Sequence, residues 1–169
     1  AIADGGQYRK PVFYTKVTDS KGNVLIDNTE NKATQVFKAS TASLLTNAME
    51  DVLEKGTGVA ARLDNMHAAG KTGTTNEAKD LVFAGFTPYY TAAIWATYDT
   101  HAEFPESDRE FHKRLWAKVM NEIHEGLADM DFETSATVQE ATICTKTGLL
   151  ARSSCPSITE YFAVSDLPT

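Results

Sequence analysis

The chain has 169 residues, of which 42% are hydrophobic, and its formal net charge is −7 with an isoelectric point near 5.1. This apolar content is enough for a packed core and excludes wholesale disorder. The acidic balance and the lack of a basic cluster argue against nucleic-acid binding, because that function needs lysines and arginines that neutralise phosphates. No apolar run reaches the length of about eighteen residues that a membrane-spanning helix needs.

The beginning of the chain has the pattern of a helix end. Ala1-Ile2-Ala3 is followed by Asp4-Gly5-Gly6, and glycine commonly stops a helix. A domain seldom begins in this way, and the sequence has neither an initiator methionine nor a signal peptide. We therefore expect a fragment that lacks an N-terminal portion; a short frayed leader is the alternative.

A β-hairpin is predicted next. Residues 11–18 are rich in valine, phenylalanine, tyrosine and threonine, and residues 24–26 form a second short apolar run. Residues 19–23, with the sequence Asp-Ser-Lys-Gly-Asn, have the composition of a turn between two strands. The polar residues 27–34 are expected to form a loop.

Residues 39–54 are predicted to form a helix, because apolar side chains recur there at helical spacing. Gly56 is a natural C-terminal stop, so that Gly56-Thr57-Gly58 becomes a tight loop with an accessible backbone. A further turn of helix through Ala60 and Ala61 is expected. The apolar side chains of the main helix are Ala42, Leu45, Met49, Val52 and Leu53.

Three extended segments follow, at residues 67–75, 81–87 and 90–98. The last two are apolar and aromatic, which is typical of central strands, and Phe83, Phe86 and Trp95 are expected in the core. Short links at residues 76–80 and at Pro88-Tyr89 favour an antiparallel meander. The predicted fold class is therefore α/β (α+β), with an antiparallel sheet flanked by helices.

A second helix is predicted from Pro105 to Gly126. Proline is favoured at the first helical position, and Glu106 and Asp108 in the first turn complement the helix dipole. One apolar stripe runs along this helix and is expected to pack on the sheet. Its members are Phe111, Leu115, Val119 and Ile123.

Residues 131–169 show weaker patterning and are expected to form a tail or small appendage, separate from a main unit at residues 1–130. This stretch holds the only two cysteines, Cys144 and Cys155. They are either a candidate disulfide, worth about 3 kcal/mol by loop-closure entropy, or two free thiols. Two cysteines without nearby histidine do not make a zinc site, and no metal or cofactor is expected.

The stretch from residue 69 to residue 75, Ala-Gly-Lys-Thr-Gly-Thr-Thr, contains a motif that two unrelated chemistries use. A phosphate-binding loop would need glycine where Asn65 stands, a buried strand before the motif and a helix after it. The segment 62–67 is a poor strand, and residues 73–76 are a poor helix start. The nucleotide-binding interpretation therefore fails on three counts.

The second chemistry is the Lys-Thr-Gly strand of penicillin-recognising serine acyltransferases. There the lysine supplies a cation and assists proton transfer at the serine, and the neighbouring hydroxyl can bind a substrate carboxylate. The glycine leaves room for an acyl group, and the next backbone N–H can donate to an oxyanion. A lone Lys-Thr-Gly is common by chance; a second copy, at residues 146–148, lacks strand context.

Residues 1–99 resemble the class A penicillin-binding proteins, the bifunctional peptidoglycan synthases, because several short pieces occur in the family's order and spacing. The tail resembles the family less closely. Val82 and Thr97 depart from the usual tryptophan and glycine. The matching pieces are Asp4-Gly5-Gly6, Lys10-Pro11, Lys55-Gly56-Thr57-Gly58, Ala69-Gly70-Lys71-Thr72-Gly73-Thr74-Thr75-Asn76, residues 80–88, Ile94-Trp95 and Tyr98-Asp99.

The resemblance implies a β-lactamase-like fold and D,D-transpeptidation of peptidoglycan stem peptides, with β-lactams acylating the same serine. It further implies an extracytoplasmic location in the cell envelope and a membrane-anchored full-length protein. By position, Lys71 is the cleft lysine, and Thr72, Gly73 and Thr74 contact substrate, with the Thr74 N–H as an oxyanion donor. Thr57 is either a further substrate contact or simply part of a helix-stop loop.

Two further family motifs are absent. No lysine has serine three residues before it, as in Ser-x-x-Lys, and no asparagine has serine two residues before it, as in Ser-x-Asn. Covalent catalysis by this chain alone is therefore not expected, and the missing N-terminal half would have to supply the nucleophile. The alternative function is a non-catalytic, degenerate module of the same fold that binds wall peptide or a protein partner.

Overall fold

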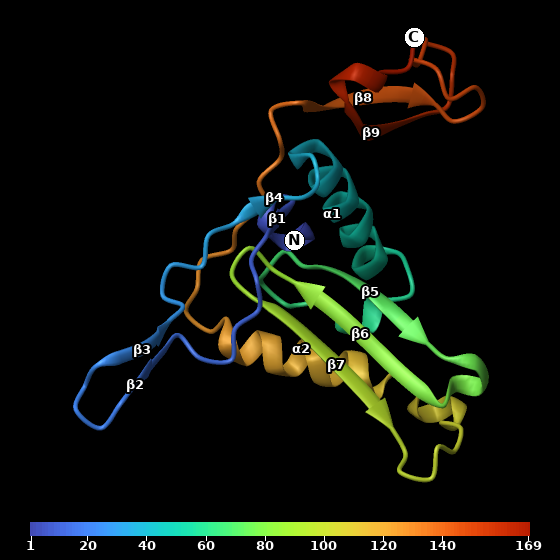
Figure 1. Ribbon diagram of the computed structural model, residues 1–169. Coiled ribbons are helices and arrows are strands. Elements are labelled where there is room, and N and C mark those ends of the chain that lie inside the picture. Colours follow the sequence, from blue (N-terminus) through green and yellow to red (C-terminus); the bar gives the residue numbers. More distant parts are fainter.

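The computed structural model describes residues 1–169 and is built around a three-stranded antiparallel sheet (Figure 1). Its strands are β5 (Ala69–Thr74), β6 (Asp80–Phe86) and β7 (Thr91–Thr97), in the order β5-β6-β7. The predicted meander is thus confirmed, with strand ends shifted by one or two residues. Only β6 is paired on both sides, so β5 and β7 each leave one edge open.

Helix α1 (Ala39–Glu54) has the predicted bounds and packs along β5. Its chain direction reverses just beyond Lys55, where the Gly58 N–H donates to the Val52 carbonyl at 2.8 Å. The predicted further turn is a short 3-10 helix, Val59–Ala61. This arrangement brings the loop after α1 back over the sheet.

Helix α2 (Phe111–Ile123) begins later than predicted. Pro105 precedes a separate 3-10 turn, Glu106–Asp108, and the α-helical backbone starts only at Phe111. Proline at this point favours any helical turn, because its fixed φ suits both kinds and its missing N–H is not needed. The prediction was therefore right that a helical turn follows Pro105, but it joined this turn to the α-helix that comes next in the chain.

The predicted orientation of α2 is wrong. The stripe made of Phe111, Leu115, Val119 and Ile123 lies away from the sheet, with each residue between 40 and 48% exposed. The face that packs on the sheet contains Trp116, whose indole N–H donates to the Ala92 carbonyl at 3.0 Å. This face buries a larger ring and satisfies its polar atom. Its members are His112, Lys113, Trp116, Ala117 and Met120.

The core lies between the inner face of the sheet, the end of α1 and the inner face of α2. Phe83 is fully buried at its centre, with its ring edge-to-face against Trp116 at 4.9 Å between centroids. Phe86 is also buried, as predicted, but Trp95 is 67% exposed because it lies on the opposite, uncovered face of the sheet. The other core members are Leu53, Ala61, Leu63, Met66, Ala117 and Met120.

The N-terminal residues form two small ladders. The predicted hairpin is present as β2 (Lys16–Thr18) and β3 (Val24–Asp27), and it projects from the body (Figure 1). The Asp19 carboxylate accepts the backbone N–H groups of Lys21 and Asn23, which closes its turn. The second ladder, β1 (Gln7–Tyr8) with β4 (Thr34–Gln35), follows the short 3-10 turn Ile2–Asp4.

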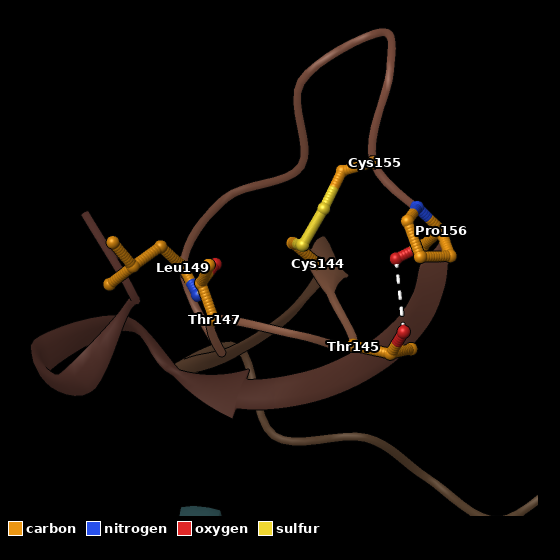
Figure 2. The surroundings of a disulfide bond; sticks show 6 residues. All are labelled: Cys144, Thr145, Thr147, Leu149, Cys155 and Pro156. Carbon is orange, nitrogen blue, oxygen red and sulfur yellow. Dashed lines mark hydrogen bonds between the residues drawn. A yellow bond between two sulfur atoms is a disulfide. The ribbon is translucent and has the colours of Figure 1, made fainter.

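Sequence patterning missed the two strands of the C-terminal segment. β8 (Val138–Cys144) and β9 (Ser157–Ala163) pair in an antiparallel hairpin next to α1 (Figure 1). Cys144 and Cys155 are joined by a disulfide at its tip (Figure 2). Neither α1 nor α2 combines the length and apolar character that crossing a bilayer requires. The division of the chain near residue 130 stays a prediction.

Candidate active site

Strand β5 presents the Lys-Thr-Gly motif on an open edge of the sheet. The Thr75 N–H donates to the Asp80 carbonyl at 3.2 Å, which shows that Thr75 and Asp80 form a hydrogen-bonded pair in continuation of the β5–β6 ladder. Since hydrogen-bonded and non-hydrogen-bonded pairs alternate in antiparallel strands, Lys71 and Gly73 direct their backbone groups toward β6. The backbone N–H and C=O of Thr72 and Thr74 therefore point away from β6, to the free edge.

Three polar side chains meet at this edge. The exposed Lys71 ammonium donates to the Thr72 hydroxyl and to the Thr72 carbonyl, at 3.2 Å each. The Thr72 hydroxyl lies 2.9 Å from that of Thr57, which comes from the loop after α1. The structure thus brings Thr57, whose role the sequence left open, into direct contact with the motif. Thr74 lies two residues further along β5, and its side chain is also exposed.

The loop that carries Thr57 is held from two sides. Gly58 packs against Val52, where an added Cβ would approach the Val52 side chain and carbonyl at 3.0 Å each. From α2, the Lys113 ammonium donates to the Thr57 carbonyl at 2.9 Å. Sequence reasoning missed Lys113. The signal was its position three and four residues before Trp116 and Ala117, on the face that proved to be buried.

Two glycines of β5 differ in their surroundings. A Cβ at Gly70 would lie 2.5 Å from the Phe83 ring and 3.0 Å from the Ala84 carbonyl, so no larger residue fits without movement of the core. At Gly73 the nearest atom, the Val82 Cβ, would be at 3.4 Å, an ordinary contact. Gly70 is therefore needed for packing. Gly73 is not, but its lack of a side chain leaves open space beside this part of the strand.

The far end of β5 is closed by a polar cluster. The Thr75 hydroxyl donates to the Asp80 carboxylate at 2.9 Å, and the Trp95 indole donates to the same carboxylate at 3.0 Å. These two hydrogen bonds, of which the one from Trp95 has the larger effect, hold the pKa of Asp80 below its usual value. Thr75 thus fixes the turn between β5 and β6.

Other perturbed groups lie outside this edge. Burial raises the pKa of Glu50 on α1, although nearby His67 opposes the shift. Burial lowers the pKa of His112, whose Nδ1 has no hydrogen-bond partner. No group of three or more His, Cys, Asp or Glu side chains in the structure is arranged to hold a metal ion.

The phosphate-loop alternative is contradicted by this geometry. Lys71 and Thr72 lie within an extended strand, and a 3-10 turn, Asn76–Ala78, follows rather than a helix. A helix N-terminus would be needed to direct several N–H groups at a phosphate. The second Lys-Thr-Gly, at residues 146–148, forms the turn after β8 and has no strand of its own.

The family model for the penicillin-binding protein transpeptidase domain matches residues 1–125. The chain belongs to the penicillin-binding protein transpeptidase family. A second family model, the C-terminal domain of penicillin-binding protein 1A, matches residues 135–169. The tail, in which patterning was weak, therefore also carries a recognised family sequence.

Curated relatives include penicillin-binding protein 1A of Clostridium perfringens, 36% identical over 85% of this chain, and that of Clostridium tetani, 34% identical over 96%. The chain spans only 17% and 22% of the length of these two proteins. The crystal structure of Haemophilus influenzae penicillin-binding protein 1A has the same fold, with a TM-score of 0.81 and 19% identity over 99% of this chain and 31% of its own. The structure of PonA1 from Mycobacterium tuberculosis matches with a TM-score of 0.63 and 26% identity, over 78% of this chain and 38% of its own.

Proposed function

We propose that β5 forms one wall of a serine acyltransferase site that cross-links peptidoglycan stem peptides by D,D-transpeptidation. The observation that carries this proposal is the open edge of β5, where an exposed ammonium, two hydroxyls in contact and outward-facing backbone N–H groups lie close together. Membership of the transpeptidase family supports the reaction class.

Each group at the edge has a distinct task in this reaction. A serine Oγ attacks the D-alanyl-D-alanine carbonyl, D-alanine leaves, and an amine of a second stem peptide then takes the acyl group. The N–H of Thr74 donates to the developing oxyanion, and the ammonium of Lys71 assists proton transfer at the serine. The hydroxyls of Thr72 and Thr74 hold the substrate carboxylate, and Gly73 leaves the acyl chain room to lie against the strand.

The nucleophile and its base are proposed to come from protein outside these 169 residues. The absence of both serine motifs supports this assignment, as does the small share of each relative that the chain spans. The open edge of β7 and the exposed stripe of α2 are surfaces that the remainder of the domain would cover, because unpaired edges and apolar patches seek partners.

We place the site in the cell envelope, outside the cytoplasm. The disulfide between Cys144 and Cys155 supports this location, since such bonds persist in oxidising compartments. Peptidoglycan stem peptides and β-lactams are the proposed ligands. We also propose that the full-length protein is anchored in the membrane, as the resemblance to the family implies.

Labelling with a fluorescent penicillin tests the proposal. The protein that contains the complete transpeptidase domain is expected to form a covalent adduct that survives denaturation, whereas these 169 residues alone are expected to form none. Labelling of the isolated chain would show that the nucleophile is misassigned. A complete protein that lacks Ser-x-x-Lys and does not label would instead favour the degenerate binding module, which the missing motifs of this chain leave open.

A further inference from the structure

Lys113 is a buried lysine with two defined partners. It lies on the inner face of α2 with only 6% of its surface exposed, and its ammonium donates to the Thr57 carbonyl at 2.9 Å and to the Glu110 carboxylate. Burying an ammonium is costly unless hydrogen bonds replace its water. Methionine or leucine would fill the same volume without that cost, so the particular contribution of Lys113 is its hydrogen bonds.

These hydrogen bonds lead directly to the strand edge. Lys113 fixes the carbonyl of Thr57, whose hydroxyl contacts that of Thr72, and the Thr72 hydroxyl in turn accepts from Lys71. The same peptide unit is also held at its other end, because the Gly58 N–H donates to the Val52 carbonyl at 2.8 Å and Gly58 packs on Val52 and Phe83. Loss of the Lys113 hydrogen bond would leave the peptide between Thr57 and Gly58 held only through the Gly58 N–H, so that the Thr57 carbonyl, and with it the hydroxyl of the same residue, would shift relative to Thr72.

We propose that Lys113 is a positioning residue for acylation. It acts through Thr57 to hold the Thr72 hydroxyl and the Lys71 ammonium in the positions at which they contact the substrate. This role rests on the proposed function of β5. Lys113 itself touches neither substrate nor nucleophile. A displacement of about 1 Å at such a contact is enough to lower a rate by one to two orders of magnitude.

The test compares acylation rates in the complete protein with a fluorescent penicillin as the probe. Rates are counted per active site, titrated with saturating penicillin, so that unfolded molecules do not contribute. Lys113→Met is expected to lower the rate about ten-fold. In a Thr57→Val background, which has already lost the hydroxyl, the same change is expected to lower it by less than about two-fold, because the two residues act in series.

Several controls separate positioning from general stability. Lys118→Met makes the same change at an exposed position of α2 and is expected to leave the rate unaltered. Lys113→Arg keeps a charged donor and is expected to retain most of the rate. If Lys113→Met does not fold, Lys113→Gln, whose amide ends one atom short of the ammonium position, replaces it in the comparison.

The outcomes are distinct. An equal effect of Lys113→Met with and without the Thr57 hydroxyl, or no effect in either background, overturns the positioning role. If Lys71→Ala also leaves acylation unchanged, the proposed function of β5 is itself wrong. If Lys71→Ala and Thr57→Val lower the rate but Lys113→Met does not, only the inference about Lys113 fails.

Discussion

Replacing Lys71 by alanine is expected to lower the rate of acylation by penicillin by about a thousand-fold in the complete protein. The change removes the only ammonium at the open edge of β5, where it donates to the Thr72 hydroxyl. Because Lys71 is exposed and outside the core, the melting temperature is expected to change little. Stopped-flow acylation and thermal unfolding measure the two quantities separately.

Lys146→Ala is the matched control for this change. Lys146 belongs to the other Lys-Thr-Gly sequence, which lies in a turn at the tip of the β8–β9 hairpin, with Gly148 at a φ of +73°. Acylation is expected to be unaffected there. A large fall in melting temperature after Lys71→Ala, without a specific loss of rate, would instead assign Lys71 a structural role.

The two glycines of β5 are expected to respond in opposite ways to substitution by alanine. Gly70→Ala should destabilise the protein by about 1–3 kcal/mol, because its Cβ would overlap the Phe83 ring beside a rigid backbone carbonyl. Gly73→Ala meets no such obstacle and should unfold at nearly the same temperature. Its methyl group, however, would occupy the surface proposed for the acyl chain, so acylation should slow by about ten-fold or more.

Thermal unfolding and acylation rates of the same two variants check this crossed pattern. Each variant is the control for the other, since the chemical change is identical and the positions are three residues apart. Normal acylation by Gly73→Ala would argue that no substrate lies against this part of β5. Normal stability of Gly70→Ala would argue that the Phe83 ring is not packed as described.

Local patterns predicted the backbone well where a single segment determines its own structure. The α1 periodicity and its glycine stop gave the observed bounds, Ala39–Glu54, and the links between β5, β6 and β7 were short enough to allow only a meander. Periodicity failed for the C-terminal hairpin. The β-favouring residues of β8 and β9, among them Val138, Ile143, Ile158, Tyr161 and Phe162, do not alternate regularly along either strand, and the strands are joined by their mutual ladder and a disulfide.

Side-chain orientation was harder to predict, because more than one apolar face was available. Helix α2 has both the stripe containing Leu115 and Val119 and the face containing Trp116, and only packing on the sheet selects between them. Trp95 was expected in the core, yet it alternates onto the uncovered face of β7. Hydrophobicity marks surfaces to be covered but does not say which partner covers them.

The candidate site was predicted in part. Family resemblance gave Lys71, Thr72, Gly73 and Thr74 as neighbours on one strand, and their roles stay proposals. The contact between Thr57 and Thr72 joins residues fifteen positions apart, and that between Lys113 and Thr57 joins residues fifty-six apart. No local pattern encodes such distances, so these contacts emerge only from the packing of α1 and α2 around Phe83.

A crystal structure of the complete protein acylated by a β-lactam would measure the geometry of the site directly. The acyl carbonyl oxygen is expected to lie about 3 Å from the backbone nitrogen of Thr74, with the drug carboxylate at the hydroxyls of Thr72 and Thr74 and the Lys71 ammonium beside the acylated serine. An adduct whose carbonyl and carboxylate lie away from the free edge of β5 would contradict this expectation.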